Sequence, residues 1–96
     1  MHELKLVSWS KHQLKPIVEA ALENELRLIE AGIRQTEHRL KEFEDKYQLK
    51  TRDFIARYED DKMEETMDFI EWIGEFRMSE RLKEKADTLR SISFAN

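Results

Sequence analysis

Residues 22–47, with the sequence LENELRLIEAGIRQTEHRLKEFEDKY, decide the fold of this chain. Their apolar residues recur at alternating spacings of four and three, which is typical of a long helix that packs along a second helix. One polar residue, Thr36, takes part in the row. We call this row the seam, and its members are Leu22, Leu26, Ile29, Ile33, Thr36, Leu40, Phe43 and Tyr47.

The charges beside the seam indicate which neighbour suits it. Glutamates recur every seven residues on one flank, at Glu23, Glu30, Glu37 and Glu44. In a parallel pair of such helices, Glu25 of one copy would face Glu30 of the other and repel it. A basic neighbour fits better, and the C-terminal part of the chain supplies one. Its bases are Arg77, Arg81, Lys83, Lys85 and Arg90.

The composition bounds the class of protein. A chain of 96 residues makes one small domain, and 40% charged residues leave it a thin core, which favours self-association. Two glycines and one proline predict long helices with few turns. The absence of cysteine excludes disulfides and thiolate catalysis, and we expect a cytoplasmic protein. No apolar run approaches the roughly 20 residues that cross a bilayer, and the net charge of −4 argues against a nucleic-acid binder.

Four segments follow from the pattern: an extended arm at 1–10, a long helix at 15–47, a short helix at 51–59 and a last helix at 63–91. The arm is apolar on both faces, with Val7 and Trp9 on one of them. It is therefore a frayed terminus, a segment packed on its own domain, or an arm that grips a partner. In the last case Trp9 is a partner-binding residue.

Two apolar stripes run along the last helix. The longer one is expected to pack against the seam, and it comprises Met63, Met67, Ile70, Met78, Leu82, Leu89 and Ile92. The second comprises Phe69, Trp72, Ile73 and Phe76, on roughly the opposite side. Four such side chains are too apolar to leave in water. Either the short helix covers them or they bind a partner, and we take them as candidate partner-binding residues.

Acidic residues lie between the two stripes. The segment 59–75 holds eight acids and one base, a formal charge of −7. Acids at a helix start are favourable in themselves, and a solvated face explains much of this charge. Beside an aromatic stripe the same charge also suits a basic partner. The candidate residues of such a surface are Glu64, Asp68 and Glu71.

The sequence offers no pattern for catalysis, a cofactor or a metal. His2, His12 and His38 are scattered, and Gln35 stands where a di-iron motif needs a glutamate three residues before a histidine. The acidic stripe has no histidine and no glycine-rich calcium-binding loop, and no glycine-rich phosphate loop is present. We expect no enzyme activity and no bound cofactor.

Three motifs within residues 37–75 carry a family resemblance: LKEFEDKY at 40–47, FIARYE at 54–59 and DFIEW at 68–72, with an acidic loop before the last. Together they resemble small helical bacterial and archaeal proteins encoded beside a small toxin, the TumA-type antitoxins. This chain departs from the pattern with Gln48 in place of a glycine and Lys50 in place of a serine or threonine cap. The resemblance implies the neutralising half of a toxin–antitoxin pair, which works by binding and not by turnover.

We therefore predict an all-α fold: a long antiparallel helical hairpin, coiled-coil-like, with a short helix at the connection. We expect a homodimer that masks a small basic toxin by direct contact. A self-associating helical scaffold without a toxin client is the alternative, and a DNA-binding autoregulator is a weaker one, because the bases of the last helix are interleaved with acids.

Overall fold

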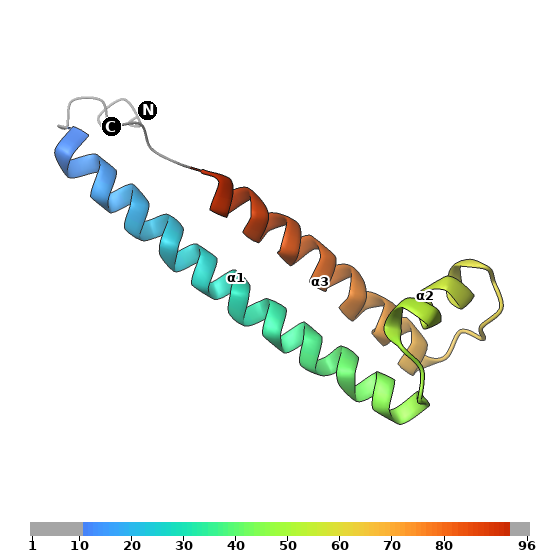
Figure 1. Ribbon diagram of the computed structural model, residues 1–96. Coiled ribbons are helices and arrows are strands. Elements are labelled where there is room, and N and C mark those ends of the chain that lie inside the picture. Colours follow the sequence, from blue (N-terminus) through green and yellow to red (C-terminus); the bar gives the residue numbers. More distant parts are fainter. Residues whose placement is uncertain (1–10, 93–96) are drawn as a thin grey trace.

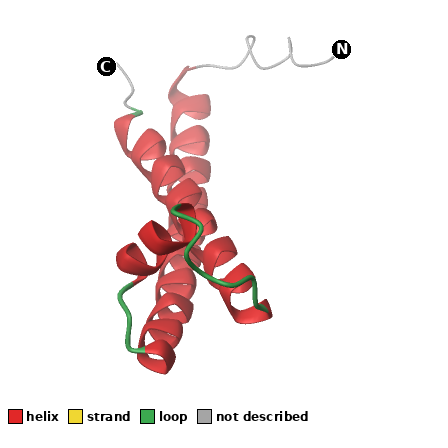
Figure 2. Ribbon diagram, turned by 90° about the vertical axis from the view of Figure 1, so that its right-hand side faces the viewer, coloured by secondary structure: helices red, strands yellow, loops and turns green. Residues whose placement is uncertain are grey.

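The computed structural model describes residues 11–92 as a helical hairpin (Figure 1). Helix α1 (Lys11–Tyr47) runs the length of the molecule, α2 (Thr51–Glu59) is short, and α3 (Met67–Ser91) returns antiparallel along α1. The described part of the chain contains helices and loops but no strand (Figure 2). The predicted fold class is confirmed. At 1.5 Å per residue, α1 alone accounts for most of the 58 Å long axis.

The helix boundaries differ from the expected ones at two places. Helix α1 begins four residues before the expected start and includes Pro16. Pro16 is the sixth residue of the helix, so it removes one helical hydrogen bond and crowds the carbonyl four residues earlier, which makes this first stretch of α1 a poorer helix than the rest. Helix α3 begins four residues after the expected start, because Thr66 caps it: its hydroxyl accepts from the backbone N–H of Phe69 at 3.1 Å. The arm at 1–10 lies outside the described residues.

The two loops that connect the helices contain no glycine. Gln48, directly after α1, and Asp61, the second residue after α2, both adopt positive φ, 51° and 58°. The turn after α1 is tied by the backbone N–H of Leu49, which donates to the carbonyl of Glu44 at 3.2 Å. A left-handed residue at this place is the common helix stop, and non-glycine residues adopt it with some strain.

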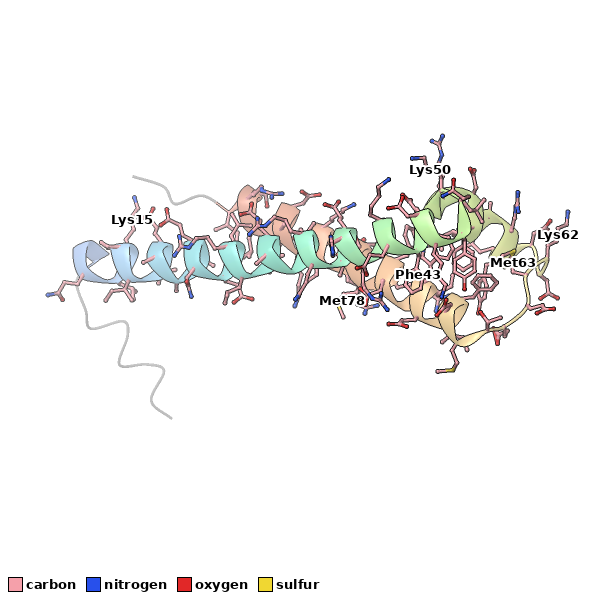
Figure 3. The ribbon with its side chains drawn as sticks, turned by 90° about the horizontal axis from the view of Figure 1, so that it is seen from below. Lys15, Phe43, Lys50, Lys62, Met63 and Met78 are labelled. Atoms are coloured by element: carbon pink, nitrogen blue, oxygen red, sulfur yellow. The ribbon has the colours of Figure 1, made fainter. Side chains whose placement is uncertain are left out.

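The seam of α1 faces α3. Its most buried members are Ile29, Thr36 and Phe43, with 3–6% of their surface exposed. Four others, Leu22, Leu26, Ile33 and Leu40, are half-buried, and Tyr47 is 37% exposed. Phe43 lies between the helices near the closed end of the hairpin (Figure 3). The core cluster there is formed by Phe43, Phe54, Trp72 and Ile73.

Helix α3 meets the seam through a row that the sequence did not reveal. Trp72, Ser79 and Ala86, spaced by seven, are almost fully buried, and Leu82 and Leu89 lie half-buried beside them. The expected long stripe is wrong at four members, Met67, Ile70, Met78 and Ile92, whose exposed fractions range from 42% to 80%. Ser79 and Ala86 are small and add little to the hydrophobic pattern of α3. The larger apolar residues on the outer side therefore dominated that pattern.

Ion pairs fix the antiparallel register. Lys83 forms an ion pair with Glu37 at 3.3 Å, and Arg90 forms one with Glu30 at 2.8 Å. These pairs confirm the expectation that bases of α3 lie against the glutamates of α1. The same expectation is wrong for three other bases, Arg77, Arg81 and Lys85, which are exposed and do not reach those glutamates within the described part of the chain. Exposed pairs of this kind select register more than they add stability.

Helix α1 continues past the end of α3. The ion pair between Glu30 and Arg90 lies one residue from the last residue of α3, so the turns of α1 before it extend beyond the hairpin (Figure 1). We call residues 11–24 the overhang. Lys15 marks it in Figure 3, at the end of α1 that neither α2 nor α3 accompanies.

The two glycines occupy opposite environments, which yields a first prediction. A Cβ on Gly32 would lie 3.1 Å from Cδ1 of Leu82, whereas a Cβ on Gly74 would meet nothing within 4 Å. Alanine is more favourable than glycine in a helix by about 1 kcal/mol. Gly74→Ala should therefore raise the free energy of unfolding by about 0.5–1 kcal/mol in urea titrations. Gly32→Ala should gain clearly less, because Leu82 must move. Equal gains would show that Gly32 does not set the helix separation.

Candidate protein-binding surfaces

The aromatic side chains of α3 lie inside the hairpin. Trp72 is fully buried and stacks on Phe54, with ring centroids 3.9 Å apart, and on Phe43 at 5.5 Å. Ile73 is 5% exposed, while Phe69 and Phe76 are half-buried. The expectation that these four side chains form a partner-binding stripe is wrong for Trp72 and Ile73. The alternative, in which the short helix covers them, describes the structure.

A polar chain links the three helices at this point. The indole N–H of Trp72 donates to Oγ1 of Thr51 at 3.1 Å, and the backbone N–H of Thr51 donates to a carboxylate oxygen of Glu44 at 2.8 Å. Partial burial by itself raises the pKa of Glu44, but hydrogen bonds from Thr51 outweigh it and leave the pKa below the usual range. Glu44 thus caps α2 from α1, because Lys50 at the cap position makes no side-chain hydrogen bond to the helix.

Two of the acidic residues that were predicted to bind a partner, Asp68 and Glu71, pair with side chains of α1 instead. Asp68 accepts from the ammonium of Lys46 at 2.6 Å and from the hydroxyl of Tyr47. These two hydrogen bonds, the one from Lys46 foremost, lower the pKa of Asp68. Glu71 accepts from the guanidinium of Arg39. Glu64 is exposed in the loop before α3. The sequence could not reveal these pairs, because acids and bases are abundant on both helices.

The exposed apolar residues gather on the outer side of α3. Met67 is 80% exposed, Ile70 49% and Met78 42%. Gly74 lies among them at the same helical spacing and is also exposed. We call Met67, Ile70, Gly74 and Met78 the outer α3 strip. Met78 was expected in the helix-packing row, and in Figure 3 it lies at the outer margin of α3.

A second group of exposed apolar residues lies on α1, where Ile17 is 56% and Leu28 61% exposed. Next to it a shallow groove of about 490 Å³ opens between α1 and α3. Its floor includes Ile29 and Leu89, and Glu25 and Lys85 stand at its edges. The other predicted partner residue, Trp9, lies outside the described residues.

Two further features concern ligands and membranes. Within residues 11–92, no three histidine, aspartate or glutamate side chains converge as they would around a metal ion. None of the helices over the same range combines the length and the apolar character that crossing a bilayer requires.

Among the described residues, Thr51 is the hydrogen-bond acceptor of the buried indole N–H, which gives a second prediction. Thr51→Val keeps the shape of the side chain but leaves the Trp72 N–H without an acceptor in the core. We expect the free energy of unfolding to fall by about 1–3 kcal/mol. Thr36→Val is the matched control, because Thr36 is equally buried but its hydroxyl bonds to the carbonyl of Ile33 in its own helix. Similar small losses in both variants, measured by urea unfolding, would contradict this role of Thr51.

Asp68 makes stability depend on pH, and this is the third prediction. Because its folded pKa lies below the usual range, its contribution is present above about pH 4 and is lost as the pH falls through the folded value. Asp68→Asn should lower stability at pH 7, and the difference from the unmodified protein should vanish in acid. Asp45→Asn is the control, because Asp45 pairs with Lys41 on its own helix. A difference that persists unchanged at pH 3 would refute the assignment.

Comparisons with protein-family models, with curated proteins and with solved structures found no match to this chain. The functional argument therefore rests on the described residues and on the motif resemblance of residues 40–72.

Proposed function

We propose that this chain is a non-enzymatic binding protein that docks another protein on the outer α3 strip. The observation that carries the proposal is the exposure of Met67, Ile70 and Met78 on one side of a helix that is otherwise well packed. Contiguous exposed apolar side chains on a small protein are typical of interaction sites. Methionine suits such a surface because its flexible side chain adapts to a partner.

Gly74 supports the same surface. No side chain of the described chain lies near its missing Cβ, so packing within the hairpin does not require a glycine there. A glycine inside a helix is unfavourable by about 1 kcal/mol relative to alanine. A partner backbone that approaches closely between Ile70 and Met78 would explain its presence. Gly32, by contrast, is explained by Leu82.

The charge around the strip favours a basic partner. Residues 59–75 carry a formal charge of −7, and Glu64 and Glu71 are exposed close to Met67 and Ile70 along the chain. Asp68 and Glu71 each pair with a base of α1, so the acids that remain most available are Glu59, Asp61 and Glu64. A negative surface of this kind accelerates association with a basic protein and selects against acidic ones.

The more specific form of the proposal is an antitoxin-like protein that neutralises a small basic toxin by direct contact. It is supported by the resemblance of the motifs at 40–47, 54–59 and 68–72 to TumA-type antitoxins. Those motifs contain Phe43, Phe54 and Trp72, the aromatic cluster at the closed end of the hairpin. The resemblance therefore concerns the closed end of the hairpin. Ile70 is the exposed apolar member of the third motif and belongs to the outer α3 strip.

Self-association as a scaffold is the second candidate, and the exposure of Ile17 and Leu28 on α1 favours it. These residues lie on another helix than the strip, so a homodimer and a bound client are compatible. No observation favours the DNA-binding autoregulator: two of the bases of α3, Lys83 and Arg90, are held by Glu37 and Glu30.

The fourth prediction tests the strip. The protein is co-expressed with the product of the neighbouring gene, and the complex is isolated and measured by calorimetry. Met67→Gln together with Ile70→Gln should weaken binding at least about 100-fold, because both side chains would be central anchors. The helix content should not change, since both residues are exposed in the hairpin.

Leu28→Gln is the matched control, an exposed apolar residue of α1 that should leave client binding intact. Rescue of growth from the neighbouring gene product gives a second readout. Full binding by the double variant would exclude the strip as the docking site. A neighbour that neither binds nor inhibits growth would exclude the antitoxin-like function itself.

A further inference from the structure

A second row of small and apolar residues follows α1 beside the seam. Its members are Leu14, Val18, Ala21, Glu25, Leu28 and Gly32, at alternating spacings of four and three. We call it the second row. Such spacing is the pattern of a helix that packs along another helix, and only Glu25 interrupts it. In the overhang the positions that would continue the seam are instead charged, at Lys15 and Glu19. The overhang is therefore apolar on the side of the second row and not on the side of the seam.

The second row leads into the groove of the hairpin. Glu25 belongs to the row and also lines the groove, together with Ile29 and Leu89. Leu28, the next member, is 61% exposed, and Ile17 beside Val18 is 56% exposed. Ala21 and Glu25 are exposed as well, whereas Leu14 and Val18 are half-buried. Over the described residues, each chain thus carries a helix end that neither α2 nor α3 accompanies and, further along the same side of α1, a groove that could receive such an end.

We propose that a second copy of this chain fills this groove, with the two α1 helices antiparallel along their second rows. In a twofold pair, the overhang of each copy lies against the groove of the other. The same contact therefore covers the overhang and fills the groove in both copies. The exposed middle of the row sets the register: Leu28 of one copy lies opposite Val18 of the other, and Ala21 lies opposite Glu25. A smaller side chain thus meets a larger one in both layers. Gly32 stays covered by Leu82 of its own chain and takes no part in the contact.

The charges favour this arrangement over a parallel one. In a parallel pair, Glu25 of one copy would meet Glu25 of the other and repel it, whereas the antiparallel register sets each Glu25 against Ala21. The charged residues of 13–24 are Lys15, Glu19 and Glu23, a formal charge of −1. The antiparallel pair places them along the end of the other copy's α3, where residues 81–91 hold four bases and two acids. Opposite signs therefore meet.

The two second rows face each other from Val18 to Leu28, which is 11 residues or about 16 Å of helix. This inference stands apart from client binding, because the second row lies on α1 and the outer α3 strip on α3. Loss of the dimer and loss of the client are separable results.

The oligomeric state is the first test, and it is the fifth prediction. Sedimentation equilibrium of the full chain should give a dimer. Ile17→Glu with Leu28→Glu should weaken it at least about 100-fold, because each substitution enters the contact twice. Circular dichroism should stay unchanged, since both side chains are exposed within one copy. Arg34→Glu, exposed on another side of α1, is the control and should leave the dimer intact.

The orientation is tested by spin labels on Asn24→Cys and Ala31→Cys, which lie seven residues apart on the same exposed flank of the second row and are each unique because the chain has no cysteine. In the antiparallel register, the two copies of position 24 are offset by about 3 Å along the axis and those of position 31 by about 24 Å. The distance between labels should therefore be much longer at 31 than at 24. Similar distances at both positions would indicate a parallel pair and overturn the proposal.

Three other outcomes also overturn it. The first is a monomer at all concentrations for the full chain. The second is a monomer that becomes a dimer only when residues 1–10 are removed, which would mean that the chain's own first segment covers the second row. A dimer that survives Ile17→Glu with Leu28→Glu would place the contact elsewhere.

Discussion

The fold depends on the burial of Trp72. Its indole ring stacks on Phe54 of α2 and on Phe43 of α1, and its N–H is satisfied by Thr51. Thr51 in turn is held by Glu44. One side chain therefore fixes the position of α2 against both long helices. Because a buried indole must place its N–H on an acceptor, the start of α2 has little freedom to move relative to α3.

This arrangement concentrates the core at one end of the molecule. The cluster of Phe43, Phe54, Trp72 and Ile73 lies at the closed end, while the open end is held by Ile29, Ala86 and the exposed pair of Arg90 with Glu30. Small residues let the helices approach there, but they bury little apolar area. The open end is thus the less stable part of one copy, and it is the end where Ala21, Glu25 and Leu28 of the second row are exposed.

The sequence predicted the seam of α1 and the hairpin, because large apolar residues mark that row at almost every position. It failed on α3, where the inward row contains Ser79 and Ala86 and so gives a weak hydrophobic pattern. Periodicity shows which residues share a face but not which face is buried. Only the position of Phe54, a contact distant in sequence, decides that Trp72 is inside and Met67 is outside.

The two proposed contacts combine without interference. In the antiparallel dimer the overhangs overlap at the centre, so the closed ends point away from each other. Residue 47 of one copy and residue 47 of the other are then separated by 48 residues along the axis, about 72 Å. That distance exceeds the width of a small domain, so each outer α3 strip can bind a client without contact between the two clients. The expected assembly is two clients on one dimer, with each site binding independently.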